Sequence, residues 1–403
     1  MKINPDAAGL DEARLERITE HLRRNYIEPG KIAGCQTLVA RHGHVAYFRS
    51  QGRMRLDQDR AVRDDTIWRI YSMTKPITSV ALMTLYEHGH FQLTDPVHRF
   101  IPEWRDLKVS EKDEDGSRRL VEPERPMNVR DLLMHMSGLS YGRVTLTTEQ
   151  PSADLGLRDW SMTLEEFVHQ LSDVHLRFHP GTRWLYSSST DVCGRLVEII
   201  SGRRFDTYLD EEIFRPLGMP DTAFHLPDDK LDRFPANYSR RGDKTLALVD
   251  DPDTSAYRKP RAFLSGGGGL LSTSVDYLRF CQMLLNGGEL DGVRVLGRKT
   301  IELMRQNHLP GGGDLRQFAI GPFGETGFDG VGFGLGFAVS LGPVQTASIG
   351  SAGEHYWGGA ASTIFWIDPV EDLVVIFMTQ LMPSATFNFR GQLRTLVYPA
   401  IVD

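Results

Sequence analysis

Apolar residues recur at intervals of three and four along several stretches of the chain, with polar residues between them. This spacing brings the apolar side chains onto one face of a helix. It predicts helices over residues 15–26, 72–88 and 205–214, and others that begin near Asn128, Thr163 and Ser188. A further helix is predicted to carry Tyr277 and Phe280 on its buried face.

Patterns typical of strands are concentrated at the two ends of the chain. Residues 37–40 and 45–48 flank a glycine-containing turn and predict a hairpin. Towards the C-terminus, strands are predicted over residues 332–341, 344–350, 356–366 and 373–380, the last three as an antiparallel meander. A closing helix is expected from about Pro383.

Three polar, poorly periodic stretches are predicted to be irregular: residues 110–124, residues 226–259, and most of residues 140–180. Helices therefore occupy the middle of the chain and strands occupy both ends. At 403 residues the chain is long for a single core. We expect a discontinuous mixed domain, residues 1–75 and 262–403, with a mainly helical domain, residues 76–261, inserted into it. A site would lie in the cleft between them.

Composition narrows the range of functions. The chain has 46 Lys and Arg residues against 53 Asp and Glu residues, a net charge of −7, and no long basic run. Nucleic acid is therefore not an expected partner. No apolar run is long enough to span a membrane, and residues 1–30 lack the apolar core of a secretory signal. We expect no membrane partner and a cytoplasmic location.

The cysteines and histidines do not indicate a metal site. Cys35, Cys193 and Cys281 are far apart and are predicted to be buried small apolar residues. The histidine pairs at 42 and 44 and at 88 and 90 lack a full ligand set, so no metal or other cofactor is expected. No phosphate-binding lysine follows the four glycines of residues 266–269. We predict that these glycines let backbone segments pass close together.

The first candidate chemistry is a Ser-x-x-Lys motif, Ser72 to Lys75, at the predicted start of a helix. Residues three apart share a helix face, and the first turn favours negative charge developing near the serine. A chain with 24 serines and 9 lysines contains about half of one such motif by chance. The motif alone is therefore also compatible with an ordinary serine and lysine.

Two further stretches supply possible partners for this pair. Tyr186 stands on the loop before a predicted helix and is followed by small hydroxyl residues. Trp357, Gly358 and Gly359 lie inside a predicted strand, where glycines allow a ligand to approach the backbone. The alternatives are a core aromatic at Tyr186 and a β-bulge at the two glycines.

In this order and at this spacing, the three stretches resemble the serine-reactive β-lactamase superfamily. The similarity is to its class C β-lactamase-like branch, and within that branch to the family VIII carboxylesterases. Residues 132–139 (LLMHMSGL), 214–219 (FRPLGM) and 265–273, with the strands around Trp357, extend it over nearly the whole chain. The resemblance implies an α+β fold like that of class C β-lactamases and DD-peptidases. In that fold an antiparallel sheet is flanked by helices, and a mainly helical domain is inserted.

The resemblance also implies roles for the matching residues. Ser72 matches the acylated serine, Lys75 its partner and Tyr186 the tyrosine of the Tyr-x-Asn element. The stretch Trp357-Gly358-Gly359 matches Lys-Thr-Gly on the strand that edges the cleft. The oxyanion is expected between the backbone N–H groups of Ser72 and Ala360. Burial and the helix dipole are expected to disfavour the charged form of Lys75, so that Lys75 and Tyr186 act as a joint base and acid.

Two departures from the β-lactamase pattern bear on the substrate. Ser188 replaces the usual asparagine and offers no amide to a substrate carbonyl. Trp357 replaces the lysine that contributes to binding the carboxylate of a β-lactam, so a charge-assisted contact is lost. An aromatic face at the pocket edge is expected instead, as the esterase branch typically has. Both changes favour a neutral, partly apolar ester.

We therefore expect a serine carboxylesterase that hydrolyses short-chain acyl esters through an acyl-enzyme on Ser72. Transesterification and weak β-lactam hydrolysis are possible side activities. Two alternatives remain: a β-lactamase or D-amino-acid peptidase or amidase that uses the same site, and a catalytically silent binding or assembly protein. The expected partner is a small-molecule ester, and the sequence sets no oligomeric state. No H-E-x-x-H motif competes with this interpretation.

Overall fold

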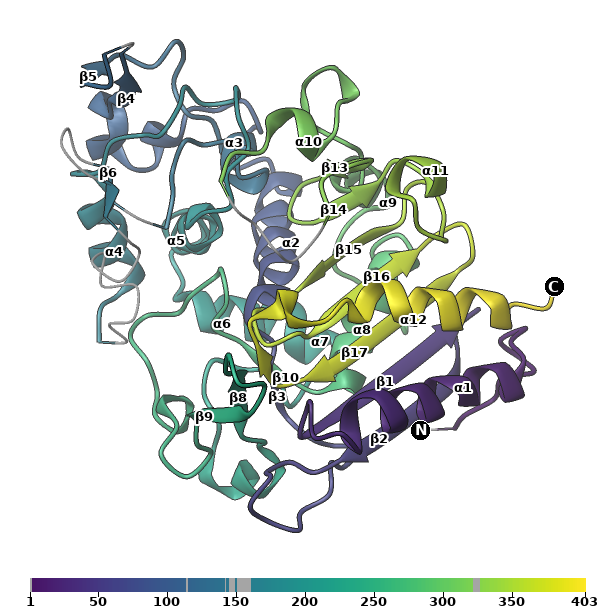
Figure 1. The fold of residues 1–403 in the computed structure, drawn as a ribbon. Coiled ribbons are helices and arrows are strands. Elements are labelled where there is room, and N and C mark those ends of the chain that lie inside the picture. The colour runs from purple at the N-terminus through teal and green to yellow at the C-terminus, as the bar shows by residue number, and fades with distance from the viewer. Residues whose placement is uncertain (1, 114, 142, 145–148, 151–160, 322–326) are drawn as a thin grey trace.

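A seven-stranded antiparallel sheet with the strand order β13-β14-β15-β16-β17-β1-β2 forms the centre of the protein (Figure 1). The structure is a computed structural model and describes residues 2–113, 115–141, 143–144, 149–150, 161–321 and 327–403. The strands of the sheet are β1 (Gly34–Arg41), β2 (His44–Gly52), β13 (Val331–Phe333), β14 (Ala338–Ser340), β15 (His355–Gly358), β16 (Ile364–Asp368) and β17 (Leu373–Thr379).

The two ends of the chain meet inside this sheet. β1 pairs with β17, with Cys35 opposite Thr379 and Arg41 opposite Leu373, and it pairs on its other side with β2. Every residue of β1 and β17 is buried. The near-continuous apolar sequence of β17 suits a strand that is covered on both faces. In β1 the polar residues Gln36, Thr37 and Arg41 are buried as well.

Helices cover both faces of the sheet (Figure 1). Helices α1 (Glu12–Leu22) and α12 (Phe389–Val397) lie over one face, and α8 (Ser274–Leu285) lies over the other. Contacts between aromatic rings show which helix packs on each face of the sheet. Phe377 of β17 lies 4.8 Å from Phe389 of α12, and Phe365 of β16 lies 5.1 Å from Tyr277 of α8.

The middle of the chain forms a group of helices around α5 (Ser189–Ser201), which contacts α2, α3, α4 and α6. The first twelve residues of α2, Thr74 to Leu85, are all buried, because α2 lies between this group and the sheet (Figure 1). The helices are α2 (Thr74–Glu87), α3 (Val129–Leu133), α4 (Leu164–Leu171), α6 (Phe205–Leu209) and α7 (Arg215–Leu217), with a π-helical turn at Asp210–Phe214.

Shorter elements complete the described chain. The remaining α-helices are α9 (Arg298–Met304), α10 (Leu315–Phe318) and α11 (Pro343–Thr346). The paired strands are β3 (Trp68–Arg69) with β10 (Leu271–Ser272), β4 (Val109–Lys112) with β5 (Arg118–Val121), β6 (Arg143–Val144) with β7 (Glu149–Gln150), β11 (Glu289–Leu290) with β12 (Val293–Arg294), and β8 (Asn237–Arg240) with β9 (Leu246–Asp250) and β18 (Leu381–Met382). Among the described residues, no helix has the length and apolar character needed to cross a membrane.

Most of the predicted elements are confirmed. The N-terminal hairpin, the helix that ends before Gly89 and the helix that ends at Gly202 all form as expected. Thr163 caps α4 and Asn128 caps α3, each in a capping box. The α+β class, with an antiparallel sheet and flanking helices, is confirmed as well.

Six predicted elements are wrong in part. Residues 356–366 form parts of two strands, β15 and β16, joined by a turn, and not one strand. Residues 110–124 contain strand β5 and most of β4, and residues 226–259 contain β8 and β9, where loops were expected. Strand β8 pairs in parallel with β18, which is distant in sequence, so local periodicity did not indicate it. Residues 344–350 are not a strand, because Pro343 starts the short helix α11. Residues 332–341 divide into β13 and β14, and the closing helix starts at Phe389 rather than Pro383.

The sheet takes its strands from residues 34–52 and 331–379, and the helices α2 to α7 come from residues 74–217. The predicted division into residues 1–75 with 262–403 and residues 76–261 stays a prediction. Residues 151–160, part of the predicted irregular stretch 140–180, lie outside the described residues.

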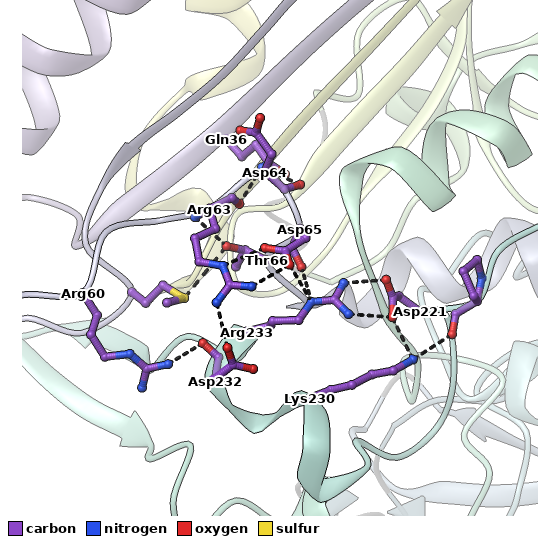
Figure 2. A network of polar contacts seen from close by, with 12 residues as sticks. Gln36, Arg60, Arg63, Asp64, Asp65, Thr66, Asp221, Lys230, Asp232 and Arg233 are labelled. Carbon is purple, nitrogen blue, oxygen red and sulfur yellow. Dashed lines mark hydrogen bonds and ion pairs between the residues drawn. The ribbon is translucent and has the colours of Figure 1, made fainter. Parts of the chain in front are cut away.

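A network of ion pairs ties the segment before β3 to the segment before β8 (Figure 2). Arg233 binds both oxygens of Asp221 and also pairs with Asp65. Arg63 pairs with Asp65 and with Asp232. The network therefore fixes the strand that leads into the Ser-x-x-Lys turn.

Candidate active site

Ser72 lies in a 3-10 turn, Tyr71–Met73, that joins β3 to the start of α2. Tyr71 has a φ of 43°, in the left-handed region that bulky residues rarely adopt. A backbone of this kind costs on the order of 1–3 kcal/mol and persists only where the surrounding structure holds it. Ser72 itself is 8% exposed, so its hydroxyl sits in a recess and not on the open surface.

Side chains from three separate elements hold this turn. These side chains, Tyr277 of α8, Asn237 of β8 and Thr363 before β16, are all fully buried. The hydrogen bonds run from Tyr277 Oη to the Met73 carbonyl at 2.9 Å, from Asn237 Nδ2 to Tyr71 Oη at 2.9 Å, and from Thr363 Oγ1 to the Ile70 carbonyl at 3.3 Å.

Lys75 lies beside Ser72, as the spacing predicts. Its Nζ donates to Ser72 Oγ at 3.2 Å and to the Gly267 carbonyl at 2.6 Å. The side chain is 1% exposed. The hydrogen bond to Gly267 aims the ammonium group at the serine, because it fixes the far end of a flexible chain.

Tyr186 faces the same lysine from the loop before α5. Lys75 Nζ lies 4.4 Å from the centre of the Tyr186 ring, a cation–π distance. Trp357 Nε1 lies 3.4 Å from Tyr186 Oη. The structure thus brings Ser72, Lys75, Tyr186 and Trp357 together from three distant parts of the sequence.

Trp357 is more enclosed than the sequence suggests. It is 1% exposed, and its ring packs against Tyr186 at 5.5 Å and against Phe333 at 5.4 Å. The structure therefore does not place this ring at an open pocket edge. It supports Tyr186 from behind, and any influence of Trp357 on a substrate acts through the position of that tyrosine.

The two glycines after Trp357 accommodate the protein's own atoms. A Cβ on Gly359 would lie 2.4 Å from the Ile70 carbonyl oxygen, and a Cβ on Gly358 would lie 3.2 Å from Arg390 Nη2. The close approach at Gly359 joins the end of β15 to the turn that carries Ser72. The expected approach of a ligand to these glycines stays a prediction.

Ala360 follows Gly359 directly, in the turn between β15 and β16. Among the turn and loop hydrogen bonds of the described residues, none uses the backbone N–H of Ser72 or of Ala360. The predicted oxyanion site, which needs two such donors, stays a prediction.

Ser188 stands at the N-cap of α5. Its side chain is fully buried, and its hydroxyl donates to the Ser140 carbonyl at 3.1 Å. The expected contact of Ser188 with a substrate stays a prediction. At this position the serine connects α5 to the loop after α3.

Asp191 and His135 were not expected at the site. Asp191 Oδ1 accepts from Ser265 Oγ at 2.6 Å and from Gly267 N–H at 2.9 Å, behind the carbonyl that holds Lys75. Burial raises the pKa of Asp191, and these hydrogen bonds and the charge of Lys75 oppose the shift. A single aspartate in the first turn of a helix is an ordinary sequence feature, so only the fold reveals its position.

His135 packs against the Tyr186 ring at 4.9 Å and is 1% exposed. Burial, with the nearby charge of Lys75, lowers its pKa well below the ordinary value, so the imidazole is neutral. The backbone φ of His135 is 58°, and the residue stands three positions before Gly138 in the LLMHMSGL stretch. Its ring packs against the Tyr186 ring and so limits where that ring can lie.

The glycine-rich stretch has the predicted role. A Cβ on Gly266 would lie 2.7 Å from the Thr190 carbonyl oxygen, and a Cβ on Gly267 would lie 2.7 Å from Asp191 Oδ2. Segments therefore pass too closely there for a side chain.

A cavity of about 950 Å³ lies beside β15 but on the side of α12, where Tyr356, Gly358, Phe389 and Arg390 line it. Ser72, Lys75 and Tyr186 are not among its lining residues. Gly359 and Thr363, which contact the Ile70 carbonyl, do line it. The predicted cleft between two domains stays a prediction.

A buried Ser–Lys pair at a helix start, next to strand β15 of an antiparallel sheet, is typical of serine hydrolases that form an acyl-enzyme. The chain matches the Beta-lactamase family over residues 19–398, and it belongs to that family.

Individual relatives indicate the type of reaction that the protein catalyses. Protein Rv1367c of Mycobacterium tuberculosis (strain ATCC 25618 / H37Rv) is 32% identical, with 91% of this chain and 90% of that protein covered. Esterase EstB of Burkholderia gladioli is 29% identical, with 94% and 93% covered. The solved structure of EstCE1, described as a hydrolase with promiscuous acyltransferase activity, has a TM-score of 0.79 at 25% identity, covering 97% of this chain and 99% of that one. The predicted resemblance to family VIII esterases is confirmed, and the protein is a serine hydrolase with ester-hydrolysing, acyl-transfer chemistry.

Proposed function

We propose that the protein is a carboxylesterase that cleaves short-chain acyl esters through an acyl-enzyme on Ser72. The observation that carries this proposal is the hydrogen bond from Lys75 Nζ to Ser72 Oγ, with Lys75 fixed from behind by Gly267. A serine is a poor nucleophile until an adjacent group takes its proton.

The reaction proceeds in two steps. Ser72 Oγ attacks the ester carbonyl carbon while its proton passes to the pair formed by Lys75 and Tyr186. The oxyanion lies between the N–H groups of Ser72 and Ala360, and one such donor contributes about 3–4 kcal/mol in the transition state. The tetrahedral intermediate collapses, the C–O bond to the alcohol breaks, and the alcohol leaves with a proton from the same pair. Water then attacks the acyl-enzyme and releases the acid.

A second outcome of the same intermediate is acyl transfer to an alcohol in place of water. The description of EstCE1 as a hydrolase with acyltransferase activity favours it. Weak β-lactam hydrolysis is the third use of this site. Trp357 offers no cation to the carboxylate of a β-lactam, so we expect β-lactams to be poorer substrates than esters.

The experiment that tests the proposal is a rapid-mixing assay with p-nitrophenyl butyrate. A burst of p-nitrophenol equal to the enzyme concentration, followed by turnover, is expected. Both should vanish in Ser72→Ala. They should remain in Ser384→Ala, a change in the 3-10 turn Ser384–Thr386, which contains no buried residue. Ester turnover that survives in Ser72→Ala would sink the assignment.

Two further assays separate the alternatives. Efficient nitrocefin turnover with poor ester turnover would favour a β-lactamase or a peptidase. The absence of a mass shift with a fluorophosphonate probe would favour a catalytically silent relative. A short acyl ester of a neutral alcohol is the small-molecule partner we expect.

A further inference from the structure

Two buried carboxyl groups meet at one phenol beside α12. Glu354 immediately precedes β15, Asp368 ends β16, and Tyr398 follows α12 in a 3-10 turn. Their exposed fractions are 1%, 0% and 8%. Tyr398 Oη lies 2.7 Å from Glu354 Oε2 and 2.7 Å from Asp368 Oδ2. The cluster therefore joins the C-terminal segment to the start of one strand and the end of the next.

These two contacts need two protons. A phenol carries one proton and donates one hydrogen bond, and an ionised carboxylate has no proton to donate. A separation of 2.7 Å is the ordinary length of an O–H···O hydrogen bond, with a proton between the two oxygens. If both acids were ionised, a lone pair of Tyr398 would face a carboxylate oxygen in a buried site, which is costly. One of the two carboxyl groups must therefore be protonated in this arrangement.

The remaining oxygen atoms of the two acids show how the negative charge is balanced. Glu354 Oε1 accepts from Nη2 of Arg394, whose side chain is also buried. Asp368 Oδ1 accepts from the backbone N–H groups of Val370 at 3.0 Å and Glu371 at 3.3 Å. One shared proton leaves one carboxylate for the buried guanidinium of Arg394. Without that proton, two buried carboxylates would repel each other across the phenol.

Burial also shifts the titration of these groups. It raises the pKa of the Glu354 carboxyl to about 6 against the charge of Arg394, and the charge of Asp368 adds to the rise. Burial and the two acids raise the pKa of the Tyr398 phenol, so the phenol keeps its own proton. Because the two carboxyl groups interact, the shared proton titrates as a property of the pair.

Other charged or titratable groups on the neighbouring elements have contacts or surroundings of their own. They are Arg390 of α12, which donates to the Trp357 carbonyl, Arg14 of α1, which donates to the Pro399 carbonyl, Glu371 and Asp372 of the turn before β17, which pair with Arg41 and His42, and His355 of β15, whose pKa burial lowers to about 4. The charge of Arg390 also opposes the rise in the pKa of Glu354. Arg394 is the cation that contacts the carboxyl pair directly.

We propose that Glu354, Asp368 and Tyr398 share one buried proton, which acts as an alkaline-sensitive latch between the C-terminal segment and the sheet. At low pH the proton lies between a carboxyl group and the phenol, and both 2.7 Å hydrogen bonds form. When the pH rises, the proton passes to hydroxide in the solvent, which becomes water. One hydrogen bond is then lost, the two carboxylates repel each other, and Tyr398 and α12 pack less firmly against the sheet.

The latch is connected to the candidate active site through α12. Arg390 Nη2 donates to the Trp357 carbonyl at 2.9 Å, and the next two residues lead to the close contact of Gly359 with Ile70. A looser α12 therefore weakens the support of β15 at alkaline pH. The proposal does not depend on the proposed esterase function, because its tests measure protonation, stability and backbone exchange.

Asp368→Asn tests the shared proton by unfolding. Asparagine keeps the acceptor for the two backbone N–H groups, and its amide donates to Tyr398 Oη without a titratable proton. The folded-state pKa of the pair lies above the ordinary values of Glu and Asp, so the stabilising contribution of the proton is complete below about pH 4 and is lost as the pH rises through about 6. In urea, the unfolding constant of the parent divided by that of Asp368→Asn should therefore increase by about tenfold between pH 4.5 and pH 8.

Glu371→Gln is the matched control for this comparison. It lies in the turn that follows Asp368, but its side chain is 31% exposed and pairs with Arg41 at 3.5 Å. The corresponding ratio for Glu371→Gln should change by less than about twofold over the same pH range. A ratio for Asp368→Asn that is as constant as that of the control would overturn the shared proton.

Infrared and hydrogen-exchange measurements test the proton and the latch separately. At pH 5.5 the parent should show a protonated carboxyl band that is absent from Asp368→Asn, and the band should disappear as the pH is raised to 9. Absence of this difference band would refute the shared proton. Over the same range, amide exchange in residues 389–400, corrected for its intrinsic pH dependence, should accelerate in the parent but not in Asp368→Asn. A band that disappears without faster exchange in the parent would refute the latch.

Discussion

Gly359 lies against the carbonyl of Ile70 so closely that a β-carbon at residue 359 would be 2.4 Å from the oxygen. Ile70 precedes Ser72 by two residues, and Gly359 immediately precedes Ala360. The contact therefore sets the separation between the two N–H groups proposed to bind the oxyanion.

Gly359→Ala should displace Ala360 from Ser72 and weaken that pair of donors. Loss of one oxyanion donor typically lowers kcat by about 10²–10³-fold, and we expect kcat to fall by about a hundredfold with a smaller change in KM. Steady-state kinetics with p-nitrophenyl butyrate measures both. Gly242→Ala is the control, because a Cβ there has no neighbour within 4 Å, and it should behave as the parent. Equal kcat values in the two variants would contradict the oxyanion assignment.

Tyr277→Phe should uncouple the serine turn from α8. The variant removes the donor to the Met73 carbonyl and leaves a buried acceptor without a partner, at a cost of about 1–3 kcal/mol. The strained backbone at Tyr71 should then relax, so the acylation rate should fall together with the free energy of unfolding.

Tyr208→Phe is the matched control for that change. Tyr208 is equally buried and its hydroxyl shares a hydrogen bond with Thr84, near the other end of α2. It should lose similar stability in urea unfolding but keep the acylation rate. A parallel loss of rate in both variants would show that general stability, and not the turn, limits acylation.

Asp276→Asn should change how stability depends on pH. Burial raises the pKa of Asp276 to about 6, although hydrogen bonds from Asp221 N–H and Thr222 oppose the shift. Because this folded-state pKa exceeds the ordinary value of an aspartate, the group's stabilising contribution is complete below about pH 4 and is lost as the pH rises through about 6. The total change across this window is at most about 3 kcal/mol.

The asparagine variant removes that dependence. Relative to the parent, Asp276→Asn should therefore be less stable at pH 4 and comparatively more stable at pH 7.5, as measured by urea unfolding at both values. Asp59→Asn, with a side chain that is 93% exposed, should show the same small difference at both pH values. A stability difference for Asp276→Asn that does not vary with pH would contradict the assignment.

Arg233→Gln should loosen the network in Figure 2. The Arg233 and Asp221 side chains are only 15% and 16% exposed and bond through both oxygens, so the loss should be about 2 kcal/mol in free energy of unfolding. Arg298→Gln removes an ion pair whose arginine side chain is 66% exposed and should cost less than about 0.5 kcal/mol. Thermal unfolding at low and high salt measures the loss of stability in both variants. Equal losses would show that the network stabilises the protein no more than an exposed ion pair does.

The sequence predicts the parts of the site that carry their own pattern. Ser72 and Lys75 are three apart on a helix, and Tyr186 and Trp357 follow in a recognisable order, so their meeting was predictable. Asp191 was not, because its partners, Ser265 and Gly267, come from a loop more than seventy residues away and leave no periodic signal. The enclosure of Trp357 likewise depends on Phe333, a residue of another strand.

The errors in the predicted secondary structure have a similar physical basis. Strand β8 is polar and only four residues long, and its parallel partner β18 lies far along the chain. Residues 344–350 have an apolar pattern suited to a strand, but Pro343 fixes the backbone for a helical first turn. Local pattern decides an element only where no distant pairing or proline competes with it.

The position of β1 between β2 and β17 also bears on biosynthesis. The N-terminal hairpin leaves the ribosome early, but the partner of β1, residues 373–379, is synthesised near the end of the chain. Until then β1 presents an unpaired edge on the side of β17, the kind of surface that associates with other nascent chains. We expect this sheet to close late and slowly, because its central pairing has a very high contact order. Folding in a cell would then benefit from chaperone protection of the first fifty residues.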